Sequence, residues 1–299
     1  MRIAIMGAGA VGCYYGALLA RAGHVVTLIG RPSLVEAVRQ RGLLLDSERF
    51  TGAVALEASD DPAAVAGAEL VLFCVKSGDT EMAGAQIAPW LDSDAHVLSL
   101  QNGVDNAARL AQVLGRDVIP VAVYVATEMV GPGHVRHHGR GDLIMGPSPN
   151  GTALAAVLDQ AGIPTRVSDT VMAALWAKLT INCAYNALSA LSGQAYGTLV
   201  QSEGVSEVMR DAFDECLAVA ASQDVALPES LWQDTLNIAR NMAAQRSSTA
   251  QDLARGRTSE IDHLNGAVVR LGQAAGIATP VNRTLWCLVK LAEQRAAPA

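Results

Sequence analysis

Aromatic residues are scarce in this 299-residue chain, at only 4% of the total. Hydrophobic residues reach 51% and charged residues only 17%, with a mean hydropathy of +0.25. Such a composition excludes a mostly disordered chain and leaves Ala, Val and Leu to build the core. The length favours two domains.

Cysteine is also scarce, and its five positions show no pattern. Cys13, Cys74, Cys183, Cys216 and Cys287 are widely spaced, odd in number and include no Cys-x-x-Cys pair. This spacing argues against a disulfide framework or a structural zinc site, and it favours a reducing cytoplasm.

The chain lacks both an excess of positive charge and a long hydrophobic run. Lys and Arg number 22 against 29 Asp and Glu, a net charge of −7, which argues against nucleic acid as the main partner. No stretch approaches the roughly 18 consecutive apolar residues of a membrane-spanning helix. The apolar N-terminus is interrupted by Gly7, Gly9, Gly12 and Gly16, so we expect neither a signal peptide nor a membrane contact.

Strand and helix signals alternate through the first half of the chain. β-type runs occupy Arg2–Met6 and residues 24–29, 70–75, 96–100 and 118–125, and helical stretches occupy Ala10–Arg21 and residues 33–41, 61–66, 79–90 and 106–114. This alternation predicts an α/β fold with a doubly wound, Rossmann-type parallel sheet.

The second half changes character. Short strand pieces are expected within residues 131–145, a helix at 153–161 and a last strand at 164–167. Alanine-rich helical stretches then follow at residues 172–191, 204–224, 231–246 and 249–275. We predict a dinucleotide-binding domain over residues 1–167 and an all-helical substrate and catalytic domain over 168–299, with a frayed tail from 295.

A glycine-rich turn follows the first strand and opens the first helix. It reads Gly7, Ala8, Gly9, Ala10, Val11 and Gly12. The first glycine permits the tight turn, the second lets a pyrophosphate approach the backbone, and the third allows close packing of helix on strand. The alternative is a glycine-rich turn without a ligand.

The end of the second strand selects the dinucleotide. NAD-binding proteins of this type usually carry an acid there for the ribose hydroxyl, but this chain reads Ile29, Gly30, Arg31. An Arg can pair with a 2′-phosphate, so we predict NADP(H), unless Arg31 merely faces solvent.

Two further strands end in polar residues, Lys76 and Asn102. In an open parallel sheet, ligands bind beyond the carboxyl ends of the strands. Lys76 could therefore contact a cofactor phosphate or a substrate carboxylate, and Asn102 could contact either molecule. Polar strand ends without a ligand are an equally open interpretation.

Lys178, Asn182 and Asn186 recur at a spacing of four residues in the helical half. At about 100° per residue they share one helix face, and the rest of the helix is apolar enough to be buried. Such polar groups need partners, unless the stripe faces water. Downstream, Ser248 with Gln251 forms a capping-box pattern, and Glu260 either faces a cleft or is a surface acid.

In combination, these motifs resemble those of the ketopantoate reductase family over almost the whole chain. The resemblance also covers Cys74-Val-Lys76, Leu100-Gln-Asn102-Gly103, Gly131-Pro-Gly133, Ser247-Ser248-x-x-Gln251-Asp252 and Glu260-Ile261-Asp262-x-x-Asn265-Gly266. It implies NADPH-dependent reduction of a 2-oxo acid, most simply 2-dehydropantoate in pantothenate biosynthesis.

The resemblance also implies roles for particular residues. Lys178 would be the general acid at the ketone oxygen, and Asn182, Asn186 and Ser248 would bind substrate. Glu260 would orient substrate or lysine beside the cofactor. Asn102 would contact cofactor and substrate, and Ala126 would give the cofactor a backbone contact.

Two positions depart from the family pattern. Tyr196 and Gln245 stand where asparagines are usual, and both positions belong to substrate recognition in the family. The reaction type is therefore better defined than the substrate. Another 2-oxo acid, a β-hydroxyacid or opine-type dehydrogenase, and a non-catalytic NADP(H) sensor remain alternatives, and a homodimer is left open.

Three closely spaced histidines and one cysteine are interpreted as structural rather than functional residues. His134, His137 and His138 lack a carboxylate or cysteine spaced to complete a metal site, so no metal is predicted. Cys13, at the start of a helix, is expected to be a buried packing residue rather than a reactive thiol.

Overall fold

The computed structural model describes residues 1–296, which form two compact units, Met1–Met172 and the remainder from Ala173. Unit 1 contains a sheet with helices on both faces, and unit 2 is helical. The predicted fold class is confirmed: the N-terminal part is Rossmann-like and the C-terminal part is helical.

Four parallel strands form the centre of the sheet in unit 1. They are β1 (Arg2–Met6), β2 (Val25–Ile29), β6 (Leu70–Phe73) and β7 (His96–Ser99), arranged in the order β7-β6-β1-β2. Their last paired residues lie in register: Met6 pairs with both Ile29 and Phe73, and Phe73 pairs with Ser99. The segments that follow all four strands therefore leave the sheet along one edge.

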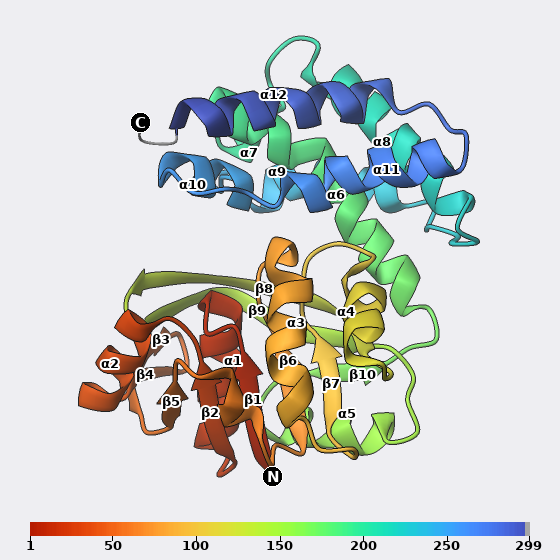
Figure 1. The fold of residues 1–299 in the computed structure, drawn as a ribbon. Helices are drawn as coiled ribbons and strands as arrows, with labels where there is room; N and C mark the ends of the chain where they lie inside the picture. Colours follow the sequence, from red (N-terminus) through yellow and green to blue (C-terminus); the bar gives the residue numbers. More distant parts are fainter. Residues whose placement is uncertain (297–299) are drawn as a thin grey trace. The chain divides into compact units, whose positions relative to one another are not determined.

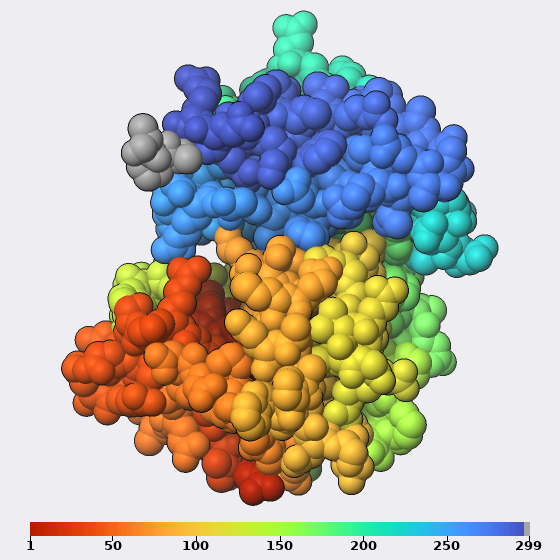
Figure 2. Space-filling view, in the orientation of Figure 1, coloured from red at the N-terminus to blue at the C-terminus, as the bar shows by residue number. Residues whose placement is uncertain are grey.

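Alternate residues of β1 enter two different cores. Ile3 and Ile5 pack with α1 (Ala10–Arg21) and α5 (Gly151–Gln160), whereas Ala4 and Met6 pack with α3 (Thr80–Ile87) and α4 (Asn106–Leu114). Figure 1 shows α3 and α4 in front of β6 and β7, and in Figure 2 the orange and yellow segments cover this face. The sheet is buried on both sides, as its continuous apolar strands predict.

The sheet extends further than the sequence analysis predicts. Instead of short pieces, β8 (Ile119–Gly131) and β9 (His134–Met145) form one long antiparallel hairpin, whose turn contains Gly133 at φ +65°. Three further strands follow α2 (Pro32–Arg41) and were not predicted: β3 (Leu43–Ser47), β4 (Phe50–Val54) and β5 (Glu57–Ser59). β3 fully buries Leu43 and Leu45, and its short run of three leucines directly after α2 resembles the end of that helix. The short strand β10 (Thr165–Val167) pairs with β9.

Among the described residues, unit 2 contains helices and no strand. They are α6 (Val171–Ser192), which begins at the end of unit 1, then α7 (Tyr196–Leu199), α8 (Val205–Ala221), α9 (Leu231–Asn241), α10 (Ser248–Ala254), α11 (Asn265–Ala274) and α12 (Pro280–Ala296). The core includes the fully buried Trp176, Tyr185 and Phe213.

One expectation for unit 2 was wrong. The single helix expected over residues 249–275 is broken: α10 ends at Ala254, Gly256 adopts φ +63°, and a short 3-10 turn (Ile261–His263) precedes α11. Because Gly256 takes a left-handed conformation, the helix cannot continue through it. Of the tail expected to fray, residues 295 and 296 belong to α12, and residues 297–299 lie outside the described residues.

Candidate active site

The glycine-rich turn is fixed by close backbone contacts. The N–H groups of Gly7 and Ala8 both donate to the carbonyl oxygen of Ile29 at 3.0 Å. A Cβ at Gly7 would lie 2.5 Å from the Val75 nitrogen, and one at Gly12 would lie 2.4 Å from the Gly7 oxygen. Gly7 also adopts φ +100°, which disfavours any L side chain. Both positions therefore require glycine for steric reasons.

Gly9 is different, because a Cβ there would meet no atom within 4 Å. It precedes α1, whose start has no side-chain cap and no acid in its first turn. The free N–H groups and the dipole of a helix N-terminus attract phosphate. The space above Gly9 thus fits the pyrophosphate of a dinucleotide, with Ala8, Ala10 and Val11 around it.

Arg31 immediately precedes α2, two residues after β2 ends. Its side chain is exposed, and within residues 1–296 it has no hydrogen-bond or ion-pair partner. The residue before it, Gly30, is held by a hydrogen bond from its N–H to the Ser59 oxygen at 3.0 Å. A guanidinium at this strand end is available to a phosphate on the adenosine ribose.

Lys76 and Asn102 lie in the loops after β6 and β7. The carbonyl of Asn102 accepts from Ser77 Oγ at 2.9 Å and from Asn106 Nδ2 at 2.6 Å, and Gln101 Nε2 donates to the Val75 oxygen at 3.2 Å. These bonds tie the two loops together at the edge where the glycine turn begins. Lys76 is exposed there, and Asn102 is half-buried.

Ala126 lies in β8, where the pairing with β9 is irregular. It is opposite Gly139, and the register shifts between Ala126 and Thr127. Such irregularities leave backbone groups out of the regular ladder. The position is compatible with the backbone contact that the family resemblance implies.

The polar stripe of unit 2 lies on α6, as predicted. Lys178 and Asn182 are half-buried, and Asn186 is buried with only 3% of its surface exposed. Within the described part of the chain, the amides of Asn182 and Asn186 make no side-chain hydrogen bond. Because Asn186 is almost covered, the stripe is not a fully water-exposed helix face, and its amide, which keeps a small contact with solvent, is accessible to a ligand.

The start of α10 requires a correction. Its cap is Ser247, not Ser248: Ser247 Oγ accepts from the Ala250 N–H at 3.0 Å and donates to the Asn186 oxygen at 3.1 Å. The N–H of Ser247 donates to Ser189 Oγ at 3.2 Å, which pins this end to α6. Ser248, the first residue of α10, is exposed, and its hydroxyl is not used for capping. The two adjacent serines could not be distinguished by sequence pattern alone.

Glu260 immediately precedes the turn Ile261–His263 and is half-buried. Its carbonyl accepts from the His263 N–H at 2.8 Å, while the next residue, Ile261, is completely buried. All five residues predicted for the site in unit 2 are now placed: Ser248 is exposed, Asn186 is buried, and Lys178, Asn182 and Glu260 are half-buried.

Tyr196 and Gln245, the two departures from the family pattern, are neighbours in the structure. Their proximity was not predicted from the sequence. The Tyr196 N–H donates to the Gln245 oxygen at 2.9 Å, so the two residues form one local feature. The Tyr196 ring is 4.7 Å from that of Tyr185 and is buried with Leu199, Met209 and Ala239. Burial raises the pKa of the Tyr196 phenol. Tyr196 is therefore a neutral core residue.

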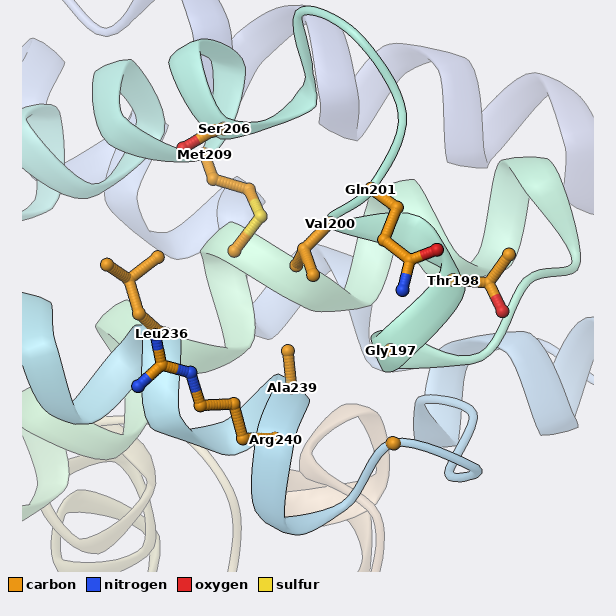
Figure 3. Close-up of a pocket in the computed structure, with 10 residues that line it drawn as sticks. Gly197, Thr198, Val200, Gln201, Ser206, Met209, Leu236, Ala239 and Arg240 are labelled. Carbon is orange, nitrogen blue, oxygen red and sulfur yellow. The ribbon is translucent and has the colours of Figure 1, made fainter.

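A pocket of about 550 Å³ opens next to this feature (Figure 3). Its lining includes Gly197 and Ala243, which are joined by a 2.9 Å bond from the Gly197 N–H to the Ala243 oxygen, and the side chains of Met209, Leu236 and Arg240. None of the residues predicted to bind substrate or cofactor lines it. The pocket therefore lies beside Tyr196 and Gln245, but the predicted catalytic and binding residues are not part of its lining.

The remaining clusters have structural explanations. Cys13 is buried and donates to the Ala8 oxygen at 3.4 Å, and burial raises the pKa of its thiol to about 12, which confirms the packing interpretation. His137 stacks on Tyr14 with ring centroids 4.3 Å apart, and His138 pairs with Glu128 at 3.0 Å. The described residues include no group of three or more His, Cys, Asp or Glu arranged to hold a metal. They also include no helix that is both long and apolar enough to cross a membrane.

A Rossmann-like unit with a glycine cradle, followed by a helical unit with a Lys and Asn stripe, defines a nicotinamide-dependent oxidoreductase. Two family models match the chain: Ketopantoate reductase PanE/ApbA over residues 3–150 and Ketopantoate reductase PanE/ApbA C terminal over residues 170–293. The chain belongs to the ketopantoate reductase family.

Individual relatives are similar along the whole chain. A PanE/ApbA family ketopantoate reductase from Ralstonia eutropha JMP134 is 56% identical, with a TM-score of 0.97 over 99% of each chain. A 2-dehydropantoate 2-reductase from Halobacterium salinarum is 35% identical over 98% of this chain and 99% of its own. A D-mandelate dehydrogenase solved with NADH and anilino(oxo)acetate shares the fold at 24% identity, with a TM-score of 0.93 over 99% of each chain.

Proposed function

We propose that the chain reduces 2-dehydropantoate to (R)-pantoate with NADPH. Residues 1–167 would bind the dinucleotide and residues 168–299 would bind the 2-oxo acid and complete the chemistry. The observation that carries the proposal is Asn186 on the same face of α6 as Lys178: the residue is 3% exposed, and its amide makes no hydrogen bond to another described residue. It supports a polar ligand site along this face of α6, with Lys178 two helical turns from Asn186.

The cradle over Gly9 would hold the pyrophosphate, with Lys76 and Asn102 on the neighbouring loops and Ala126 contacting the cofactor through its backbone. Arg31 would pair with the 2′-phosphate, which makes NADPH the preferred cofactor. When bound, NADPH supplies a hydride to the carbonyl carbon of the substrate.

The residues of unit 2 would stabilise the negative charge that develops on the ketone oxygen of the substrate. Lys178, an ammonium at neutral pH, would stabilise this oxygen and transfer a proton from Nζ to it, leaving a neutral amine that is reprotonated from solvent. Asn182, Asn186 and Ser248 would orient the substrate by hydrogen bonds, and Glu260 would orient the substrate or Lys178.

The substrate is the less constrained part of the proposal. Tyr196 is buried in the core, so the hydrogen bond that an asparagine would offer there is absent. We expect ketopantoate to be reduced with a raised KM or in competition with another 2-oxo acid. Oxidation of NADPH with a panel of branched, linear and aromatic 2-oxo acids tests this. Ketopantoate as the best substrate by a wide margin would show that the two departures are harmless.

The same assay separates the alternatives. For this the panel also includes 3-oxo acids and pairs of a 2-oxo acid with an amino acid. A β-hydroxyacid dehydrogenase would turn over the former, an opine-type dehydrogenase would need the added amino acid, and a non-catalytic NADP(H) sensor would bind NADPH and turn over none. A cytoplasmic location and a homodimer stay predictions, which cell fractionation and light scattering would test.

A further inference from the structure

The segment that carries Glu260 is irregular, yet it is held firmly on both sides. It connects α10 to α11 without a continuous helical hydrogen-bond ladder, and Glu260 lies between Ser259 and the turn Ile261–His263. Because an irregular segment cannot fix a side chain by itself, its anchors determine where the Glu260 carboxylate lies.

The anchor before Glu260 is Glu293, on α12. Glu293 Oε1 accepts from the Ser259 N–H at 2.8 Å and from Ser259 Oγ at 2.7 Å. Ser259 Oγ in turn accepts from the Ile261 N–H at 3.2 Å, so the contact reaches across Glu260. The Glu293 side chain is only 10% exposed, and its second oxygen lies 3.3 Å from Lys290 Nζ.

The anchor after Glu260 is Asp262, which is also held by α12. Asp262 Oδ1 accepts from Trp286 Nε1 at 2.6 Å, and Oδ2 accepts from Lys290 Nζ at 2.7 Å. The Lys290 and Trp286 hydrogen bonds outweigh burial and hold the pKa of Asp262 below its usual value. Lys290 is thus shared between Asp262 and Glu293.

We propose that Glu293 is a positioning residue that sets the place of the Glu260 carboxylate in the reaction, and this inference rests on the role proposed for Glu260. Ser259 is 8% exposed, so without Glu293 its N–H and hydroxyl would lose their acceptor in a nearly dry environment. The segment would then shift to recover hydrogen bonds. A displacement of about 1 Å in a catalytic group can cost up to about 100-fold in rate.

The test is a double-mutant cycle with steady-state kinetics. Glu293→Ala should lower kcat about tenfold, within the range expected for a misplaced group. Glu293→Gln keeps an oxygen at the Oε1 position and loses only the charge toward Lys290, so it should restore kcat to within about twofold of the unmodified enzyme. In a Glu260→Gln background, adding Glu293→Ala should lower kcat no further, because there is no catalytic carboxylate left to misplace.

Glu215 offers a matched control at the other end of α12. Its carboxylate accepts from the Val281 N–H at 2.8 Å and from the Asn282 N–H at 2.9 Å. Glu215→Ala removes the same kind of backbone anchor and should lower Tm as Glu293→Ala does, while kcat stays unchanged. If Glu293→Ala fails to fold, Ser259→Ala removes only the hydroxyl contact and should give a smaller fall in kcat.

The outcomes distinguish the inference from the proposal beneath it. An unchanged kcat in Glu260→Gln alone would remove Glu260 from the mechanism, and the inference with it. A fall in Glu260→Gln together with an unchanged kcat in Glu293→Ala would overturn the inference alone. So would a full additional loss in the double variant, or an equal fall in kcat in Glu215→Ala.

Discussion

The two units build their proposed sites from different parts of the chain. In unit 1 the backbone forms the cradle: Gly7 and Gly12 are required by contacts of 2.5 and 2.4 Å, and Gly9 leaves space for a ligand. In unit 2 side chains form the site, and Asn186 is held through its carbonyl by Ser247. A site made by the backbone has a fixed sequence signature. For a site made by side chains, the sequence shows the shared helix face but not the contacts that hold each residue.

The largest effect is expected at Lys178. Lys178→Met should lower kcat by about 10²–10⁴-fold, the usual contribution of a general acid, because Met fills similar space and cannot donate a proton. Steady-state kinetics with circular dichroism to confirm folding provides the measurement. A lysine that only grips the substrate carboxylate would instead raise KM and spare kcat. Glu260→Gln should cost less, since Glu260 acts one step from the proton.

Cofactor preference should depend on Arg31. NADPH should bind more tightly than NADH, and Arg31→Ala should remove most of the difference, about 1.5–3 kcal/mol for a charge-assisted contact. Dissociation constants of both cofactors, measured by fluorescence titration, test this. Arg41→Ala is a useful control, because that side chain donates to the Pro132 oxygen at 2.8 Å at the other end of α2. Equal affinities for NADPH and NADH in the unmodified protein would contradict the prediction.

Substitutions of the two adjacent serines, Ser247 and Ser248, should have different effects: one on protein stability and the other on substrate binding. Ser247→Ala removes a helix cap and the bond to the Asn186 oxygen, so it should lower the free energy of unfolding by about 0.5–2 kcal/mol. Ser248→Ala should leave stability nearly unchanged and raise KM. Chemical denaturation and kinetics of the pair are the measurements, and a reversed pattern would return the capping role to Ser248.

The smallest effect is expected at the pocket of Figure 3. Arg240 lines it with an exposed guanidinium, but no predicted substrate residue does. Arg240→Ala should therefore leave kcat and KM for the 2-oxo acid within about twofold, the small change expected away from the reacting groups. A large rise in KM in Arg240→Ala would indicate instead that the substrate binds in this pocket.

The sequence predicted the parts of the molecule that obey local rules. The strand–turn–helix around Gly7–Gly12 follows from glycine sterics, and the stripe from Lys178 to Asn186 follows from helical periodicity. Both were placed on the correct elements, β1–α1 and α6.

The parts that sequence missed depend on distant contacts. The strand β3 has only three consecutive leucines directly after α2, too short a run to separate from the end of that helix, and it is fixed by pairing with β4 and β9. The choice of Ser247 over Ser248 as cap is decided by its bond to Asn186, 61 residues away. The hydrogen bonds from α12 to the residues on both sides of Glu260 likewise cannot be predicted before α12 is positioned in the fold.

In this account, unit 1 binds the cofactor and unit 2 supplies the proton donor. One paired measurement tests this separation most directly. NADPH dissociation constants and kcat would be determined for Gly9→Ala and Lys178→Met in parallel. Gly9→Ala places a methyl group in the open space of the cradle, so it should weaken NADPH binding and leave kcat at saturating NADPH nearly unchanged. Lys178→Met should do the reverse. A large loss of NADPH affinity in Lys178→Met, or a loss of kcat at saturating NADPH in Gly9→Ala, would contradict the account.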